Sequence, residues 1–232
     1  MAESQRVVII GGHGKIALLA APKLVAAGFS VESLIRDPDQ AQDITDAGAT
    51  PRVLDIESAG SAELVDAFTG AHAVVFSAGA GGGNPARTKA VDHEAAVRSM
   101  DAALEAGVSR YVMVSYARSE TDIDTVDPKS SFYPYALAKH QADKHLRGTS
   151  LDYTILGPGS LTLEPASGKI TVLDPATTGE VMSSEDASVD TSRENVAEVI
   201  TETLRSGSAV RATVNFFDGE TPIQEALASV SS

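Results

Sequence analysis

The segment Arg6–Ala17, with the sequence RVVIIGGHGKIA, constrains the fold of this chain more than any other. An apolar run leads through a glycine-rich turn into a stretch that predicts a helix, Lys15–Ala27. Such a short apolar run, bounded by glycines, is typical of a strand that is buried on both faces of a parallel sheet. We therefore expect a strand, a turn and a helix to form the first unit of the fold.

Small residues recur every third position in this turn, at Gly11, Gly14 and Ala17. A missing or minimal side chain lets the turn tighten, lets the backbone approach a pyrophosphate and lets the helix pack close to the strand. The free N–H groups and the positive dipole end of the helix would then face the phosphates. The pattern favours dinucleotide binding, although a purely structural turn has the same spacing.

Composition excludes several classes of function. The chain has 232 residues and a formal net charge of -14, from 32 acidic and 18 basic residues, which argues against a nucleic-acid partner. It has no cysteine, so disulfides and thiol chemistry are excluded, and its five histidines lack the spacing of a metal site. The sequence shows neither a signal peptide nor an apolar run of about 20 residues. We expect a cytoplasmic protein, monomeric or homodimeric, without a membrane partner.

Predicted strands and helices alternate along the chain. This order predicts a doubly wound parallel α/β sheet of the Rossmann type, in a single domain over residues 1–232. Further strands are expected at 29–35, 49–54, 71–76, 108–115, 151–156, 169–173 and 211–217. Further helices are expected at 39–47, 61–68, 88–106, 132–147, 191–204 and 222–227.

Charged residues follow the second and third predicted strands. Arg36 ends the second strand, where a dinucleotide fold meets the adenosine ribose, and its guanidinium suits a 2′-phosphate. Asp37 beside it keeps NAD possible, and the two could also be an exposed pair at a helix start. Asp55 could accept a hydrogen bond from the adenine amino group or cap the next helix. We expect NADP(H) to be preferred and NAD(H) to be possible.

A glycine-rich loop follows the fourth predicted strand. Its sequence, SAGAGGGNP over residues 77–85, has glycine at four of the five positions from 79 to 83. So many glycines do not support a regular element and instead allow a close backbone approach. The loop is expected to pass beside the ribose and nicotinamide of the cofactor, the alternative being a flexible connection.

Tyr135 and Lys139 are candidate catalytic residues on the helix after the fifth strand. They are four residues apart and therefore share one helical face. A nearby ammonium lowers the pKa of a phenol, which would make Tyr135 a usable proton donor. Ser115, at the end of the fifth strand, could hold a substrate carbonyl against that phenol. A Tyr-x-x-x-Lys pair also occurs in helices with no catalytic role.

These motifs together resemble the short-chain dehydrogenase/reductase superfamily. The similarity is to its atypical single-domain NAD(P)H-binding branch, which includes NmrA-like sensors and biliverdin/flavin reductase-like enzymes. It covers residues 6 to about 163 in the right order, and the tail NFFDGETPIQEAL is also similar. The motifs are GGHGKIA, Arg36, Asp55-Ile56, FSAGAGGG, VDHEAAVRSMDAALEAGVSRYVMVS, YALAKHQAD and SLDYTILGPGSL.

The resemblance implies roles for individual residues. Arg36 would bind the 2′-phosphate, Lys139 the nicotinamide ribose, and Tyr135 would be the general acid for carbonyl reduction. Two positions depart from the pattern of the superfamily: Ala117 stands where extended members carry the catalytic serine, and Gly157 where related proteins carry arginine. The other cofactor residues implied are Gly11, Gly12, His13, Gly14, Lys15 and Ile16 at the pyrophosphate, Asp55 and Ile56 at adenine, and Ser77, Ala78 and Gly79 beside the ribose.

The sequence therefore predicts an NADP(H)-binding oxidoreductase that transfers hydride to a small carbonyl, quinone or flavin-like acceptor. The segments 116–134 and 157–187 are expected on the substrate side. The alternative is a non-catalytic NADP(H) sensor that acts through a protein partner, which the departure at Ala117 favours. An epimerase or dehydratase of nucleotide sugars is a third possibility, less favoured because the chain after the sixth strand is short for a separate substrate domain.

Overall fold

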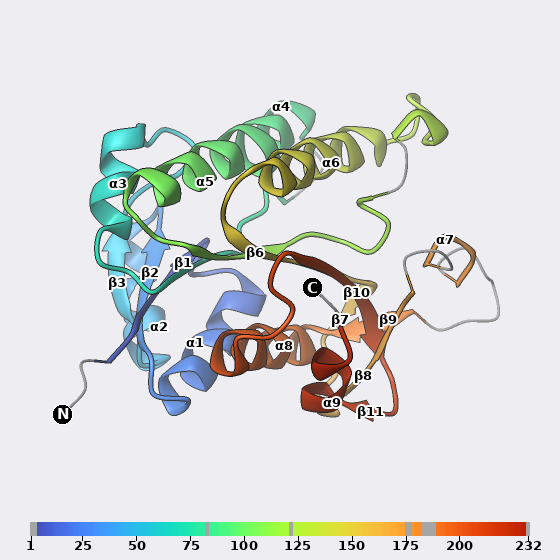
Figure 1. Cartoon of the computed structure of the whole chain (residues 1–232). Helices are drawn as coiled ribbons and strands as arrows, with labels where there is room; N and C mark the ends of the chain where they lie inside the picture. The colour runs from blue at the N-terminus through green and yellow to red at the C-terminus, as the bar shows by residue number, and fades with distance from the viewer. Residues whose placement is uncertain (1–3, 82–83, 121–122, 175–177, 182–188, 231–232) are drawn as a thin grey trace.

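The computed structural model describes residues 4–81, 84–120, 123–174, 178–181 and 189–230. A twisted sheet of nine strands crosses the molecule, with helices on both of its faces (Figure 1). Within these ranges no helix is both long and apolar enough to cross a membrane.

Seven strands of this sheet are parallel, which confirms the predicted doubly wound α/β fold. They lie in the order β10-β6-β5-β4-β1-β2-β3, and two short strands, β8 and β11, extend the β10 edge with antiparallel pairing. The seven are β1 (Arg6–Ile10), β2 (Ser30–Ile35), β3 (Thr50–Val53), β4 (Ala73–Phe76), β5 (Arg110–Val114), β6 (Asp152–Pro158) and β10 (Ala212–Asp218). The antiparallel strands are β8 (Lys169–Val172) and β11 (Thr221–Pro222).

The helices divide between the two faces of the sheet. One face carries α1 (Lys15–Ala26), α2 (Ala41–Asp46), α8 (Arg193–Ser206) and α9 (Ile223–Ala228), and the other carries α3 (Ser61–Phe68), α4 (Pro85–Thr88), α5 (Ala96–Glu105) and α6 (Tyr133–Gly148). Two 3₁₀ turns, Pro38–Gln40 and Ile123–Thr125, lie between these elements. A small second sheet pairs β7 (Ser160–Thr162) with β9 (Asp190–Ser192), and α7 (Thr178–Val181) lies between them in the chain.

Strand β1 shows why the fold has two hydrophobic cores. Its side chains alternate between the faces of the sheet, as the side chains of any strand do. Val7 and Ile9 pack into the core with α1 and α8, whereas Val8 and Ile10 pack into the core with α3, α5 and α6. All four are fully buried, as the short apolar run predicted.

One predicted helix differs in form from the expectation. The helix predicted over 88–106 begins at Pro85 and includes a π-helical stretch, Lys89–Ala95, before α5. π-helical turns inside α-helices are rare and are frequent at functional sites. Asp92 lies in this wider turn and is almost completely buried. The other predicted helices and strands agree with the structure within about three residues at each end.

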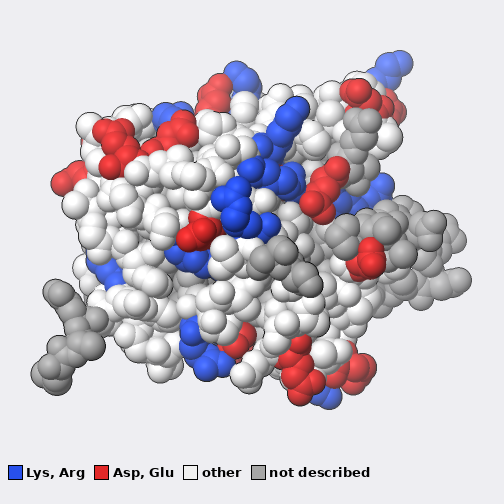
Figure 2. Space-filling view, viewed as in Figure 1, with Lys and Arg blue, Asp and Glu red and all other residues white. Residues whose placement is uncertain are grey.

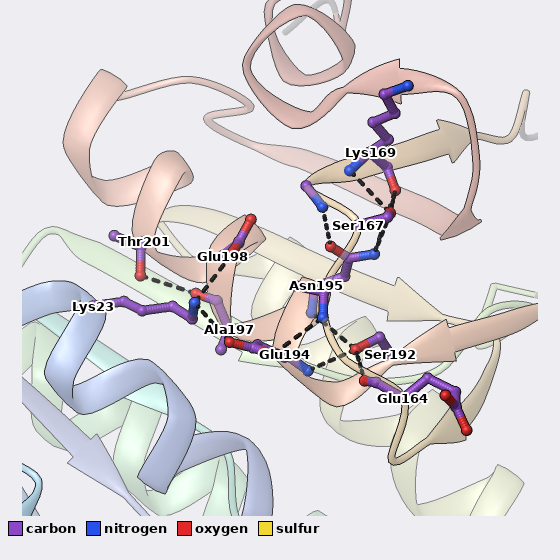
Figure 3. A network of polar contacts seen from close by, with 12 residues as sticks. Lys23, Glu164, Ser167, Lys169, Ser192, Glu194, Asn195, Ala197, Glu198 and Thr201 are labelled. Atoms are coloured by element: carbon purple, nitrogen blue, oxygen red, sulfur yellow. Dashed lines mark hydrogen bonds and ion pairs between the residues drawn. The ribbon is translucent and has the colours of Figure 1, made fainter.

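Asn195 connects the edge of the sheet to helix α8 (Figure 3). Its side chain accepts a hydrogen bond from Gly168 N and donates to Ser167 Oγ and Asp218 Oδ1. Ser192 caps the same helix by accepting from the backbone N–H groups of Glu194 and Asn195. These polar contacts add to the apolar packing of β8 and β10 against α8 in the same core.

Replacing this buried amide should therefore destabilise the protein. Asn195→Ala leaves a backbone N–H and a carboxylate without their partner, so we expect it to lower the free energy of unfolding by about 2–4 kcal/mol in urea denaturation. Thr201→Ala on the same helix, whose hydroxyl only bonds back to Ala197 O, is the control and should change stability by less than about 0.5 kcal/mol. Equal effects of the two variants would contradict this account.

Candidate functional site

The strand order places the carboxyl ends of β1 and β4 side by side. The chain proceeds from β1 outward to β2 and β3 and then returns to β4 on the other side of β1. In open α/β sheets, ligands bind in the crevice at such a switch point. The two turns that follow these strands are in close contact, since a Cβ on Gly11 would lie only 2.6 Å from Ala78 Cα.

Glycine is required at three positions of the first turn for different reasons. Gly11 has a φ of +79°, which favours glycine, and it also faces Ala78. A Cβ on Gly12 would lie 2.4 Å from the Cβ of Ser33 on the neighbouring strand. Gly14 is the N-cap of α1, where no side chain caps the helix, so the first N–H groups of α1 are left for a ligand.

A cavity of about 290 Å³ opens at this switch point. Turns after β1, β2, β3 and β4 form its walls, and ten of the residues predicted to bind the cofactor line it. These ten are Gly11, Gly12, His13, Gly14, Arg36, Asp55, Ile56, Ser77, Ala78 and Gly79. Lys15 and Ile16 begin α1 next to this cavity but do not line it, and Gly82 and Gly83 lie outside the described residues.

Two arginines give this cavity a positive wall. Arg36 is exposed and forms no hydrogen bond or ion pair with other residues in the described ranges. Arg87, on α4, donates to Ala80 O at 2.8 Å and lies 3.3 Å from a Glu57 carboxylate oxygen. Lys and Arg side chains gather near the middle of the face seen in Figure 2. An anionic ligand can therefore find cations here although the chain is acidic.

The acidic residues near Arg36 have other partners. Asp37 accepts a hydrogen bond from Asp39 N and so caps the 3₁₀ turn that follows β2. Asp55 uses one carboxylate oxygen to accept from Glu57 N, while it still lines the cavity. Of the two predictions for Asp55, the capping of the next helix is wrong, because Gly60 is the N-cap of α3 and Asp55 bonds within the turn that follows β3. His13, in the glycine turn, lies 2.7 Å from a carboxylate oxygen of Asp43 on α2.

A second cavity, of about 450 Å³, lies beyond the ends of β5 and β6. It is lined by aromatic and small residues from both segments that were predicted on the substrate side. Arg118 is the charged residue of this wall, and it has a φ of +79°, a strained value for a residue with a side chain. The lining residues are Tyr116, Ala117, Arg118, Thr125, Val126, Phe132, Pro158, Gly159 and Ser160.

Tyr135 lies behind the aromatic wall of the second cavity. Its ring centroid is 5.4 Å from that of Tyr116 and 5.5 Å from that of Phe132, and these two rings line the cavity. The structure does not bring Tyr135, Lys139 or Ser115 into the wall of either cavity. They form instead a largely buried layer, in which Lys139 and Ser115 are buried and Tyr135 is half-buried behind the rings of the second cavity.

Lys139 is the centre of this buried layer. Its side chain is 2% exposed, and its ammonium donates to Val114 O at 2.7 Å. The nearest carboxylate oxygen of Asp92 is 4.0 Å away, and the second oxygen of Asp92 accepts from Ala80 N in the wall of the first cavity. A buried ion pair thus links α6 to the cofactor-side loop.

The expected pKa shift of Tyr135 was wrong, and Ser115 has a hydrogen-bond partner that the sequence did not suggest. The pKa of Tyr135 is raised rather than lowered, first because the ring is buried and then because Asp92 and other groups lie nearby. The Lys139 ammonium does not offset this, since Val114 and Asp92 hold it. The Ser115 hydroxyl donates at 2.5 Å to the buried carboxyl of Asp143, so it is not free to hold a substrate carbonyl.

Sequence reasoning missed three charged residues in or beside the site: Arg87, Asp92 and Asp143. Arg87 follows the glycine loop, just before the helix predicted over 88–106. Asp92 lies inside that helix, where only its apolar face was considered. Asp143 is four residues after Lys139, so the helical period that singled out Tyr135 and Lys139 could also have found it.

Known proteins share this architecture. A family profile described as NAD(P)H-binding matches residues 11–206. The UPF0659 protein YMR090W of Saccharomyces cerevisiae is 35% identical over 97% of this chain and 98% of its own length. A Bacillus halodurans structure assigned as an NAD-dependent epimerase/dehydratase is 30% identical, with a TM-score of 0.84 over 98% of this chain and 100% of its own. The Lactococcus lactis oxidoreductase ylbE is 25% identical, with a TM-score of 0.81 over 97% of this chain and 96% of its own.

The contact between Gly11 and Ala78 predicts the effect of a single methyl group. Gly11→Ala should lower the free energy of unfolding by more than about 2 kcal/mol and weaken NADPH binding, because it combines a positive φ with a steric clash. Gly70→Ala is the matched control, since Gly70 has a φ of +76° but no atoms within 4 Å of the added Cβ. Gly70→Ala should lower the free energy of unfolding by only about 1–2 kcal/mol, the cost of a positive φ for a residue with a side chain. It should leave NADPH binding unchanged in calorimetry. Unchanged binding in Gly11→Ala would contradict the assignment of this turn.

Proposed function

Because this chain belongs to the NAD(P)H-binding family, we propose that it is an NADP(H)-dependent reductase of the short-chain dehydrogenase/reductase type, with the dinucleotide in the first cavity and the hydride acceptor in the second. The observation that carries this proposal is a set of contacts that connects the two cavities. Asp92 accepts from Ala80 N in the wall of the first cavity and lies 4.0 Å from Lys139, and on the same helix Tyr135 packs on rings that line the second cavity. The first cavity supplies a glycine turn, an uncapped helix start and two arginines, which suit a phosphorylated ligand.

The surroundings of Arg36 and Asp37 support a preference for NADP over NAD. The Arg36 guanidinium is free of partners in the described part of the chain, and it can bind a 2′-phosphate with two parallel hydrogen bonds. The Asp37 carboxylate, which would have to accept from a 2′-hydroxyl of NAD, does not line the cavity, and one of its oxygens accepts from Asp39 N. The buried Ser77 hydroxyl in the wall of this cavity lacks a protein partner in the described ranges, so a ligand hydroxyl can satisfy it.

The second cavity suits a flat acceptor. Its aromatic side chains, Tyr116 and Phe132, offer ring faces for stacking, and Arg118 supplies a cation. Carboxylates are absent from the described lining, so the partly negative oxygen of a carbonyl or quinone acceptor meets no like charge there. These features support a quinone, a flavin-like ring or an aromatic carbonyl as the acceptor.

The protonation state of Tyr135 favours the direction of reduction. When bound, NADPH supplies the hydride. Burial raises the pKa of the Tyr135 phenol, so it carries its proton at neutral pH and can donate it to the reduced acceptor. The reverse reaction would need a phenolate, which the nearby Asp92 carboxylate disfavours. Tyr116, whose pKa burial raises to about 12, is likewise a neutral donor in the wall of the second cavity.

A sensor without turnover remains the second candidate. It is favoured by the position of Ser115, whose hydroxyl is bonded to Asp143, and by the small side chain of Ala117 in the acceptor cavity. Such a protein would bind NADP(H) in the first cavity and change its affinity for a protein partner with the NADP/NADPH ratio. Measured turnover separates it from the reductase.

Removing Arg36 tests the cofactor assignment. Arg36→Ala should weaken NADPH binding by about tenfold to a hundredfold, because it removes charge-assisted hydrogen bonds worth about 1.5–3 kcal/mol. NADH binding should change by less than about twofold, since NADH lacks the 2′-phosphate. Arg52→Ala is the control, because Arg52 pairs with Glu32 and Asp66 and does not line the cavity. Equal losses for NADPH and NADH in Arg36→Ala would overturn the assignment.

Removing the Tyr135 hydroxyl tests the reductase proposal. Wild-type protein with NADPH should reduce at least one of menadione, riboflavin and 4-nitrobenzaldehyde, followed by NADPH absorbance. Tyr135→Phe should bind NADPH as tightly and lower kcat by about 10²–10⁴-fold, because the proton donor is lost. Tyr153→Phe, which removes a hydroxyl from a core tyrosine of β6, is the control and should retain turnover. Turnover that survives Tyr135→Phe would exclude Tyr135 as the donor.

A further inference from the structure

Asp143 is a buried carboxyl that no part of the proposed mechanism uses. It lies on α6, four residues after Lys139 and eight after Tyr135, so the three share one helical face. It is fully buried, and its Oδ2 accepts the hydrogen bond from Ser115 Oγ at 2.5 Å. Its other oxygen, Oδ1, has no hydrogen-bond partner among the described residues. A half-satisfied carboxylate in the interior is costly and calls for an explanation.

The charges around Lys139 suggest that this carboxyl holds a proton. One buried ammonium faces two buried carboxyls, those of Asp92 and Asp143, so ionisation of both would leave one negative charge uncompensated. Asp92 is the better stabilised of the two, since it lies 4.0 Å from the ammonium and also accepts from Ala80 N. In agreement, burial raises the pKa of Asp143, against the opposing effects of Lys139 and the Ser115 hydroxyl.

Charged and titratable groups face this carboxyl from several elements. Lys139 and Arg147 of α6 favour its ionised form, whereas burial disfavours it more strongly. The Ser119 hydroxyl also favours the ionised form. The other groups around it are the phenols of Tyr116 and Tyr135 and the Asp92 carboxylate across Lys139.

We propose that Asp143 is a positioning residue, whose carboxyl determines the direction in which the Ser115 hydroxyl donates its hydrogen bond. While Asp143 is ionised, Ser115 must donate its single proton to Oδ2, and none remains for an acceptor molecule. When a proton from solvent binds to Oδ2 of Asp143, the new O–H faces Ser115 Oγ across the same 2.5 Å contact. That O–H then donates to Ser115 Oγ, and the Ser115 proton becomes available at the end of β5.

The proposed reductase is therefore active when Asp143 is protonated. Ser115 does not line the second cavity itself but directly precedes Tyr116 and Ala117, which do, so its freed hydroxyl can donate a hydrogen bond to an acceptor oxygen that reaches past them. Water supplies the proton of Asp143 and takes it back, and Ser115 keeps its own proton throughout. This catalytic consequence rests on the proposed function, whereas the titration of Asp143 does not.

Carbon-13 NMR of protein labelled at the aspartate carboxyl tests the titration without any cofactor. The Asp143 resonance, assigned by its loss in Asp143→Asn, should titrate above the range of the exposed aspartates. Ser115→Ala should raise its pKa further, because the Ser115 hydroxyl stabilises the carboxylate. Titration of Asp143 within the range of the exposed aspartates, or a pKa that Ser115→Ala leaves unchanged, would overturn the proposal.

A pH profile of NADPH-dependent menadione reduction, between pH 5 and 9, tests the consequence for catalysis. Because the active form is protonated, kcat/KM of the wild type should fall by about tenfold as the pH rises through the pKa of Asp143. In Asp143→Asn, the amide N–H donates to Ser115 Oγ as the protonated acid would, so the profile should become flat at the low-pH level. Ser115→Ala should be flat at about a tenth of that level.

The control is Asp101→Asn, which makes the same change at an exposed carboxylate that pairs with His145. It should keep the wild-type profile. A wild-type profile in Asp143→Asn would overturn the positioning role, and if this variant does not fold, a wild-type profile in Ser115→Ala would do so. If the wild type reduces no acceptor, the proposed function fails, and the NMR titration alone decides whether Asp143 directs Ser115.

Discussion

The close approach of the turns after β1 and β4 is the constraint on which the site depends. The chain leaves β1 toward the face covered by α1 and leaves β4 toward the face covered by α5, so a crevice opens where the two paths separate. The crevice stays narrow because Gly11 has no side chain to hold Ala78 away. The same contact fixes the start of α1, whose uncapped N–H groups then point into the crevice. Sheet topology and one absent side chain together create the cofactor cavity.

Local sequence patterns were sufficient to predict that the residues of this crevice meet at one edge of the sheet. The short apolar run of β1 is typical of a strand that is buried on both faces. The glycines that follow it indicate a tight turn, because glycine allows a positive φ and a close backbone approach. Residues at the ends of parallel strands meet at one edge of the sheet, so Arg36, Asp55 and Ser77 could be grouped from their positions alone. The antiparallel edge strands β8 and β11 carry no such signal, because pairing direction depends on contacts distant in sequence.

The chemistry of the buried layer could not be predicted in the same way. A four-residue spacing shows that Tyr135 and Lys139 share a face, but it does not show what that face touches. The Lys139 ammonium turns to Val114 O and Asp92, and the pKa of Tyr135 therefore follows burial and not the neighbouring cation. Burial and partner geometry are properties of the packed interior, and they determine the sign of a pKa shift. Ser115 and Asp143 are 28 residues apart, and only packing of α6 on β5 brings them together.

The distribution of charge connects the two halves of the site. The chain carries a net charge of -14, so at long range it repels an anionic dinucleotide. In the proposed complex, binding would have to be driven at short range, by Arg36, Arg87 and the start of α1, where screening by salt is least effective. The buried layer, in contrast, carries an excess of negative charge when both carboxyls are ionised. One ammonium faces the two carboxyls, and solvent does not screen them. A proton on Asp143 relieves that excess of negative charge, and it does so at the one carboxyl that also holds Ser115.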